Sequence, residues 1–441
     1  MTEQHHFVAV VGAGPAGLFA ARELATQGAR VVVFNRDIKP GGLAEYGIYP
    51  AKHTMKEGLR KQFRQVLENP NIEYYGNVTI GTKGDLTLDD LRSAGFQAIL
   101  VTAGAQGTKW LGLPGENVQG VYHAKDVVYF YNNLPPYPQK DFLFGRKCAV
   151  VGAGNVMVDI ARYLIQEVKA DEVVAVVRRG PAEVKFDKKE MEYVVANLDL
   201  EALDKEIARV TPIMQAVGQD PAAARASMLE ALPKAAPKVA ETKFRFEFLA
   251  SPVQMVADEN GKLAYLELED NTLELKGTDT KARGTGNKRM LAVETVIFAI
   301  GDKVDDTFGL PIEWNEFVKN PSPRFPVDGI SYEAYDPQTK QPIADVFVGG
   351  WSRQASSGLV GYARKDGTNA SKAVWQYLQT LPPNGANTER LGQLLERADR
   401  PIVRNADIKK LEAVEKAEAE KRGLEEFKFA SNEEMLKAIG M

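Results

Sequence analysis

The chain has 441 residues, of which 26% are charged, and its formal net charge is -4. This length allows two or three domains with a buried core, and so small a net charge gives no indication of a nucleic-acid partner. No stretch approaches the roughly 18 consecutive apolar residues that a membrane-spanning helix requires. The sequence therefore predicts a cytoplasmic protein without a membrane span.

Cys148 is the only cysteine of the chain. A single thiol cannot close an intramolecular disulfide, form a Cys-x-x-Cys redox pair or supply the four thiolates of an iron–sulfur cluster. The four histidines show no metal-ligand spacing, so no metal site is predicted. Any electron chemistry must therefore run through bound organic cofactors, and Cys148 itself is expected to be a small buried residue.

A glycine-rich motif follows the first apolar segment of the chain. Residues 7–11 have the pattern of a strand, residues 15–27 that of a helix and residues 31–34 that of a second strand. Residues 12–17, between the first strand and the helix, read GAGPAG. In such a unit the first glycine permits a tight turn, the second lets the backbone approach a pyrophosphate, and the third lets the helix pack close to the strand.

A second motif of this type, GAGNVM at residues 152–157, follows a strand predicted over residues 147–151 and opens a helix that extends to about residue 166. Met157 replaces the third small residue and would hold the helix slightly away from the strand. Arg178 and Arg179 end the next strand, near the position that reads the ribose. Paired guanidinium groups there favour a 2′-phosphate, but solvated strand-end charges are an alternative, so NADP and NAD both remain open.

Two such units predict an α/β fold with two Rossmann-like dinucleotide-binding domains, and two dinucleotides in one chain indicate hydride exchange between a flavin and a nicotinamide. Two further strands, over residues 98–102 and 295–300, end in small-residue turns typical of the carboxyl edge of a parallel sheet. Residues 243–280 alternate around an Asn-Gly hairpin signal at 260–261, and the tail from residue 387 has a charged helical pattern.

Five segments of the chain carry a resemblance to a known family. They are residues 41–50 (GGLAEYGIYP), 154–162, 178–190, 349–351 (GGW) and 357–361 (SGLVG). Together, and in this order, they resemble the adrenodoxin reductase family of ferredoxin-NADP reductases, which is itself similar to the small subunit of glutamate synthase. The resemblance covers essentially the whole chain.

The resemblance implies a glutathione-reductase-like architecture in which the nicotinamide domain is inserted into the FAD domain. The expected ranges are 1–108 for the first part of the FAD domain, 109–303 for the NAD(P) domain with a helical insertion at 195–240, and 304–441 for the second part of the FAD domain. FAD is expected to lie extended along the first motif, with the flavin near the glycines that follow residue 40. The FAD-binding residues expected are Gly12, Gly14, Ala16, Gly17, Asn35, Gly41, Gly42, Leu43, Gly104, Gly350, Trp351, Gly358 and Leu359.

The nicotinamide nucleotide is expected on the second motif. The residues expected to bind it are Gly152, Gly154, Asn155, Val156, Arg178, Arg179 and Glu190. Gly358 and Asp159 are the catalytic candidates, because a small residue at 358 leaves room for the nicotinamide to stack on the flavin and the family pairs the acid at 159 with a histidine. Here His53 falls one residue late in its loop, so that pairing is open.

The expected partner is an iron–sulfur electron-transfer protein or subunit. Glu192 stands where the family carries an arginine that docks acidic ferredoxins, and a reversed charge rejects the usual partner. A basic stripe with helical spacing offers another docking face, although a solvated helix face is an alternative. The stripe consists of Lys52, Lys56, Arg60, Lys61 and Arg64.

The sequence thus predicts an FAD-dependent oxidoreductase that exchanges hydride with NAD(P)(H) and single electrons with an iron–sulfur partner, either as a ferredoxin reductase or as the flavin subunit of a larger redox complex. The alternative is a flavin-bearing scaffold or binding subunit with a vestigial nicotinamide site. Two departures from the usual motif, Met157 and Asn35, favour that alternative. Asn35 replaces the acidic residue that accepts the ribose hydroxyls, and an amide accepts only through its carbonyl oxygen.

Overall fold

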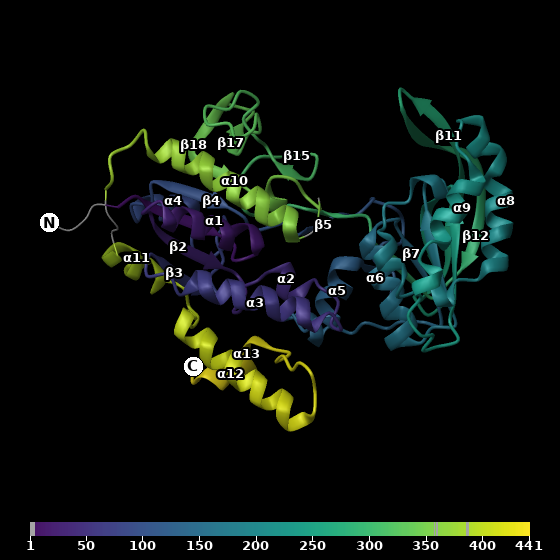
Figure 1. Ribbon diagram of the computed structural model, residues 1–441, viewed down its shortest axis with the longest axis horizontal. Helices are drawn as coiled ribbons and strands as arrows, with labels where there is room; N and C mark the ends of the chain where they lie inside the picture. Colours follow the sequence, from purple (N-terminus) through teal and green to yellow (C-terminus); the bar gives the residue numbers. More distant parts are fainter. Residues whose placement is uncertain (1–4, 357, 359, 385–387) are drawn as a thin grey trace. The chain divides into compact units, whose positions relative to one another are not determined.

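The computed structural model describes residues 5–356, 358, 360–384 and 388–441. The chain forms two compact units (Figure 1). The first combines Met1–Lys109, Tyr129–Gln139 and Gly301–Met441, and the second combines Trp110–Val128 and Lys140–Ile300. The predicted α/β class, with one dinucleotide-type unit inserted into the other, is confirmed. The expected range 109–303 differs from the observed division at Tyr129–Gln139, which belongs to the first unit.

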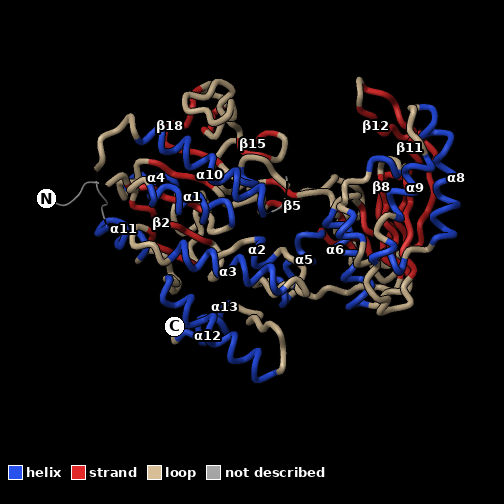
Figure 2. Tube along the Cα trace, viewed as in Figure 1, coloured by secondary structure: helices blue, strands red, loops and turns tan. Residues whose placement is uncertain are grey.

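The first unit contains a six-stranded sheet in the order β17-β18-β4-β1-β2-β3, in which only the β17–β18 pair is antiparallel. Figure 2 draws the strands in red and the helices in blue. The strands of this sheet are β1 (Phe7–Val11), β2 (Arg30–Asn35), β3 (Ile72–Gly76), β4 (Ala98–Val101), β17 (Glu333–Asp336) and β18 (Gln341–Val348). The chain steps from β1 to β2 and β3 on one side and returns to β4 on the other side. The carboxyl ends of β1 and β4 therefore form a switch point, where ligands of such sheets bind.

Helices cover both faces of this sheet. Side chains alternate along β1, so that Val8 and Val10 join one hydrophobic cluster while Phe7 and Ala9 join the other. Helices α1, α3, α10, α12 and α13 contribute to the first cluster, and α4 and α11 to the second. The helices are α1 (Pro15–Thr26), α2 (Leu43–Tyr46), α3 (His53–Leu67), α4 (Leu88–Ser93), α10 (Val360–Leu378), α11 (Thr388–Leu395), α12 (Asn405–Arg422) and α13 (Asn432–Ile439).

The second unit contains a five-stranded parallel sheet in the order β6-β13-β7-β8-β9 and an antiparallel sheet in the order β10-β11-β12. The strands are β6 (Val121–His123), β7 (Lys147–Val151), β8 (Glu172–Val177), β9 (Lys243–Phe248), β10 (Ala250–Ala257), β11 (Leu263–Lys276), β12 (Asp279–Ala292) and β13 (Thr295–Phe298). The associated helices are α5 (Ala124–Tyr131), α6 (Asn155–Tyr163), α7 (Lys188–Met191), α8 (Leu200–Ala216) and α9 (Pro221–Leu229).

Two details of the second unit depart from the sequence-based expectation. The Asn-Gly hairpin between β10 and β11 is present, but β11 continues into a second hairpin with β12, which the sequence reading missed because the β12 segment is mostly polar. Helix α6 ends at Tyr163 and passes into a short π-helix over Leu164–Val168. Within the described residues, every helix is too short or too polar to cross a lipid bilayer.

Candidate functional site

The first glycine motif forms a tight turn between β1 and α1 that only glycine can make. Gly12 has a φ of 107°, and a Cβ atom there would lie 2.5 Å from the carbonyl oxygen of Thr102. At Gly17 a Cβ atom would lie 2.0 Å from the carbonyl oxygen of Gly12. The Thr102 hydroxyl donates a 3.0 Å hydrogen bond to that same oxygen. The turn, the helix and the end of β4 are therefore in direct contact.

The middle glycine of the motif faces open space. Gly14 is the N-cap residue of α1 in an extended conformation, and no atom of the described residues lies within 4 Å of the position of a Cβ. No side chain caps the first turn, and Pro15 occupies its first position. The N–H groups of a helix start bind anions through hydrogen bonds and the helix dipole. This geometry fits the pyrophosphate of a dinucleotide.

The predicted flavin-side loop packs directly on this turn. The N–H group of Gly41 donates a 2.7 Å hydrogen bond to the carbonyl oxygen of Ala13. A Cβ atom on Gly42 would lie 3.1 Å from the Cα atom of Gly14. Both glycines have positive φ angles, and Leu43 then begins α2. The structure thus brings the predicted residues 12–17 and 41–43 together.

The side chain of Asn35 braces the backbone beside the glycine turn. Its carbonyl oxygen accepts a 3.0 Å hydrogen bond from the N–H group of Ala13, and its amide donates to the carbonyl oxygens of Asp37 (2.8 Å) and Lys39 (3.0 Å). A carboxylate could accept the first of these bonds but could not donate the other two. Asn35 therefore has a structural use at this position that the sequence reading did not anticipate.

A cavity of about 290 Å³ lies at the carboxyl ends of β2 and β3 in the first unit. Its lining includes Arg36 and Asp37, which follow β2, and Asn77 and Thr79, which follow β3. The carboxyl edge of a parallel sheet is where dinucleotides bind in this class of fold. The cavity therefore provides space beyond Asn35 in the same unit as the first motif.

A buried carboxylate fixes the loop that contains Gly350 and Trp351. Asp366 on α10 accepts a 2.6 Å hydrogen bond from the N–H group of Gly350 and forms a 2.6 Å ion pair with Arg353. A Cβ atom on Gly350 would lie 2.7 Å from the Cβ of Ala16, so α1 also reaches this loop. Sequence reasoning missed Asp366 because helical spacing alone does not show which polar residue turns inward.

Two further contacts concern the predicted flavin residues. The N–H group of Gly104 donates a 3.0 Å hydrogen bond to the hydroxyl of Ser352, which joins the end of β4 to the Trp351 loop. Gly358 has a φ of 73°, and a Cβ atom there would lie 2.5 Å from the Cβ of Tyr362. The local backbone conformation and the contact with Tyr362 therefore require glycine at position 358, whatever binds there. Leu359 lies outside the described residues.

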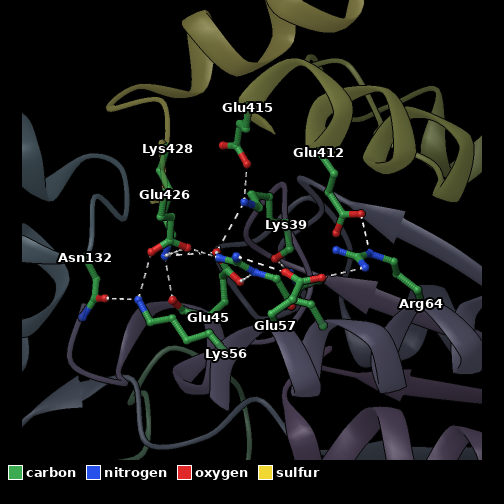
Figure 3. A network of polar contacts seen from close by, with 12 residues as sticks. Lys39, Glu45, Lys56, Glu57, Arg64, Asn132, Glu412, Glu415, Glu426 and Lys428 are labelled. Atoms are coloured by element: carbon green, nitrogen blue, oxygen red, sulfur yellow. Dashed lines mark hydrogen bonds and ion pairs between the residues drawn. The ribbon is translucent and has the colours of Figure 1, made fainter. Parts of the chain in front are cut away.

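The predicted basic stripe on α3 is not a free surface. Lys56 is 1% exposed and donates to Asn132, Arg60 pairs with Glu45 at 2.6 Å, and Arg64 pairs with Glu412 at 2.7 Å. The C-terminal segment supplies two of the opposing carboxylates, Glu412 and Glu426 (Figure 3). Glu45 of α2 and Glu57 of α3 supply others. The docking role expected of the stripe as a whole is therefore wrong, because these three cations are already paired with carboxylates of the same chain.

A network of buried charges holds the C-terminal segment to the flavin-side loop. Glu45 pairs with Lys39 (3.3 Å), Arg60 (2.6 Å) and Lys428 (3.0 Å). Figure 3 shows Lys39 and Lys428 on the side of Glu45 that faces the C-terminal segment. Burial alone would raise the pKa of the Glu45 carboxyl, but these three cations outweigh it and hold the pKa well below its usual value. Glu45 is thus a permanent anion directly after Gly42 and Leu43.

The second glycine motif repeats the geometry of the first. Gly152 has a φ of 151°, and a Cβ atom there would lie 2.4 Å from the carbonyl oxygen of Ala299 at the end of the neighbouring strand segment. Gly154 is the N-cap residue of α6, and nothing lies within 4 Å of its Cβ position. Met157 is fully buried in the third position, so the larger side chain is accommodated. A second helix start is therefore open to an anion.

The loop after β8 is tied to this second motif. The Asn155 amide donates a 2.7 Å hydrogen bond to Asp187, and the N–H group of Asp187 donates back to Asn155 at 2.7 Å. The N–H group of Lys185 also donates to the carbonyl oxygen of Ala153 at 2.8 Å. Val156 is 44% exposed at the start of α6, and Glu190 lies half-buried on α7.

The two predicted phosphate-binding arginines have different surroundings. Arg178 is exposed, and its side chain forms no hydrogen bond or ion pair with the residues that the structure describes. Arg179 is half-buried and pairs with Glu183 at 3.4 Å and with Asp279 at 3.5 Å. Asp279 is 100 positions further along the chain, so no local pattern reveals it.

The remaining predictions concern the acid–histidine pair and metal ions. Asp159 lies half-buried on α6, and His53 at the start of α3 pairs with Glu425 at 2.7 Å. His53 therefore contacts the C-terminal segment. Over the described ranges, no group of three or more His, Cys, Asp or Glu side chains is arranged to hold a metal ion.

Comparisons with known proteins cover nearly the whole chain. Residues 6–203 match the family model of pyridine nucleotide-disulphide oxidoreductases. The chain is 28% identical to the mitochondrial NADPH:adrenodoxin oxidoreductase of Salvelinus fontinalis, over 97% of this chain and 90% of that protein. It is 26% identical to the NADPH-ferredoxin reductase FprA of Mycobacterium leprae, over 98% of each.

A solved structure shows the same fold over its full length. Mycobacterium tuberculosis FprA in complex with NADPH superposes with a TM-score of 0.80 at 23% identity and covers 99% of this chain and 100% of that one. The single cysteine excludes an internal cysteine pair of the kind that the name of the family model suggests. The resemblance predicted from the sequence is confirmed, because over nearly its whole length the chain is similar to NADPH:adrenodoxin oxidoreductases and NADPH-ferredoxin reductases.

Proposed function

We propose that this protein binds FAD in its first unit and NAD(P)(H) in its second, exchanges hydride between them, and passes single electrons to or from an iron–sulfur protein. The observation that carries the proposal is the duplicated helix start, in which Gly14 and Gly154 face open space while Gly12 and Gly152 close the turn behind them. A flavin exchanges hydride with a nicotinamide and single electrons with a metal centre.

The residues of the first unit fit an extended FAD. The start of α1 would bind the pyrophosphate, and the loops at Gly41–Gly42 and Gly350–Trp351 pack on the same turn and on α1. Asp366 and Glu45 hold these two loops through buried ion pairs. The chain therefore fixes the cofactor's surroundings in advance, which alignment of the two reacting rings requires.

The residues of the second unit fit a nicotinamide nucleotide. The start of α6 would bind its pyrophosphate, and Arg178 and Arg179 lie at the end of β8 near the expected ribose. The relatives named above are NADPH-dependent by name. Hydride transfer needs alignment of the rings and no proton from the protein, so Asp159 is proposed to help orient the nucleotide.

The partner is proposed to be an iron–sulfur protein, in line with the names of the relatives. Glu192 replaces a docking arginine, so the partner's surface is expected to be less acidic at that contact, as in a dedicated subunit. The cytoplasmic location predicted from the sequence stays a prediction. Nothing in the comparisons supports the alternative of a flavin-bearing scaffold.

Anaerobic rapid mixing of the purified yellow protein with NADPH and with NADH tests the proposal. Bleaching of the flavin absorbance by either nucleotide is the expected result. A colourless protein that does not take up FAD, or a yellow protein that neither nucleotide bleaches, would contradict it. Copurification of the protein from its source would then identify the electron partner.

A further inference from the structure

The pairing of Arg179 suggests how the nucleotide site discriminates between its two possible ligands. Arg179 follows β8, where the ribose of the nucleotide is expected. Its guanidinium contacts two carboxylates, Glu183 at 3.4 Å and Asp279 at 3.5 Å. A cation with two anionic neighbours contributes little net attraction for a third anion.

Glu183 is a built part of the site. Its side chain is 9% exposed, its Oε2 atom accepts a 3.0 Å hydrogen bond from the N–H group of Gly180, and its Oε1 atom accepts one from the hydroxyl of Thr280. The loop that carries it is tied to the glycine turn through Lys185 and Ala153. Glu183 is therefore held beside Arg179 whether or not a nucleotide is present.

Asp279 comes from a separate element, the β11–β12 hairpin. The carbonyl oxygens of Arg178 and Arg179 accept hydrogen bonds from the Asn271 amide (2.9 Å) and from the N–H group of Leu249 (3.2 Å). The arginine backbone is therefore anchored to β11 and to the residue between β9 and β10. The Asp279 side chain is 81% exposed. An exposed pair is weak and yields to a stronger ligand more easily than the pair with Glu183 does.

We propose that Glu183 and Asp279 set the nucleotide preference of this protein by occupying Arg179, so that recognition of a 2′-phosphate depends mainly on Arg178. The inference rests on the proposed function of the second unit. The proposal assigns a role in nucleotide specificity to two acidic residues. One of them, Asp279, lies on the β11–β12 hairpin, outside the strand–turn–helix unit that contains the glycine motif. We expect the ratio of NADP to NAD affinity at this site to be smaller than it would be if both arginines were unpaired.

The test is calorimetric titration of the FAD-loaded protein with NADP⁺ and with NAD⁺, which requires no turnover. Glu183→Gln removes the charge, keeps one acceptor oxygen for the N–H group of Gly180, and places an amide N–H group that can donate to the Thr280 hydroxyl. It should raise the ratio of NADP⁺ to NAD⁺ affinity about fivefold. Asp279→Asn should raise it about twofold. In an Arg179→Ala background both increases should largely disappear, because the carboxylates act through that arginine.

Glu274→Gln is the matched control, since it removes a carboxylate from the same hairpin that pairs with Arg283 instead. It should leave the ratio unchanged. If the two nucleotides bind but neither Glu183→Gln nor Asp279→Asn changes the ratio, or if Glu274→Gln changes it equally, the inference is overturned. If the unaltered protein binds neither nucleotide, the proposed function of the second unit fails with it.

Discussion

The ammonium group of Lys428 donates a 2.8 Å hydrogen bond to the backbone carbonyl oxygen of Glu45 and forms a 3.0 Å ion pair with its carboxylate. The two residues are 383 positions apart, and both are buried. Glu45 lies in α2, directly behind the glycines expected at the flavin. The C-terminal segment therefore supports the flavin-side loop through a buried ion pair that is shielded from water.

Replacing Lys428 with methionine should destabilise the first unit and weaken FAD retention. Removing one partner of a lone buried ion pair typically costs about 3–5 kcal/mol, and the loss here should be smaller because Lys39 and Arg60 still pair with Glu45. Thermal unfolding and the FAD content after gel filtration measure the two effects. Lys437→Met, on the exposed face of α13, is the control and should change neither. An unchanged melting temperature for Lys428→Met would contradict the supporting role of this pair.

Lys56 should make stability depend on pH in the alkaline range. Burial and the nearby charge of Lys428 lower its pKa to about 8, although Glu426 and Glu45 offset part of their effect. An unfolded lysine has a pKa of about 10.4, so between these values the unfolded chain binds more protons and the free energy of unfolding rises with pH.

Denaturation with urea at intervals from pH 8 to pH 10 measures this contribution. Between pH 8 and pH 10, the free energy of unfolding should rise by up to about 2 kcal/mol more for the unaltered protein than for Lys56→Met. Lys61→Met, an exposed lysine on the same helix, should run parallel to the unaltered protein. Parallel curves for Lys56→Met as well would mean that Lys56 keeps an ordinary pKa.

The two kinds of glycine in the motif should respond differently to alanine. Gly14→Ala meets open space and an ordinary φ, so the protein should fold normally but bind FAD about tenfold more weakly, because the methyl group enters the space for the pyrophosphate. Gly12→Ala meets the Thr102 carbonyl at a positive φ and should lower stability itself by about 2 kcal/mol or more. Thermal unfolding without FAD and titration with FAD separate the two. Equal losses of stability would contradict the distinction.

Arg178 should carry more of the 2′-phosphate recognition than Arg179. It is the arginine whose side chain pairs with none of the described residues. Arg178→Ala should weaken NADP⁺ binding about tenfold and NAD⁺ binding far less, whereas Arg179→Ala should have a smaller effect on their ratio. Titration with both nucleotides gives the comparison. If Arg178→Ala weakened NADP⁺ and NAD⁺ binding equally, Arg178 would not recognise the 2′-phosphate.

Cys148 should be inert in the folded protein. It is fully buried in β7, and burial raises the pKa of its thiol to about 12. A thiol reagent at pH 8 should therefore label the native protein negligibly and the urea-unfolded protein stoichiometrically, as absorbance of the released product shows. Rapid labelling of the native form would indicate that this strand opens readily.

The sequence predicted the elements that depend on local patterns. Strands β1 and β7 have the predicted bounds, α1 begins at Pro15 as expected, and both glycine turns form. The charged helical pattern predicted for the tail is confirmed by α12, which ends at Arg422 before Gly423, a C-cap in the left-handed conformation. Such signals are short in range, because hydrophobic periodicity and glycine conformation act within a few residues.

Predictions that assigned a function to a charged or polar side chain were less reliable. Lys56, Arg60 and Arg64 have the spacing of an exposed basic stripe, yet they are paired with residues of α2, α3 and the C-terminal segment. Asn35 deviates from the acidic residue of the usual motif, yet its amide makes two backbone hydrogen bonds that an acid could not make. In both cases the decisive partner is set by the fold.

The sequence by itself determined that this chain has two glycine-rich turns of the dinucleotide-binding type, a single cysteine and a resemblance to the adrenodoxin reductase family. These features follow from residue identity and spacing, which the linear chain already contains. Only the tertiary structure decided that Lys428 supports Glu45, that Asp366 fixes Gly350 and that Asp279 contacts Arg179. Each of these pairs joins separate elements, and a charge acts on whichever neighbour burial brings within a few ångströms, however distant that neighbour is along the chain.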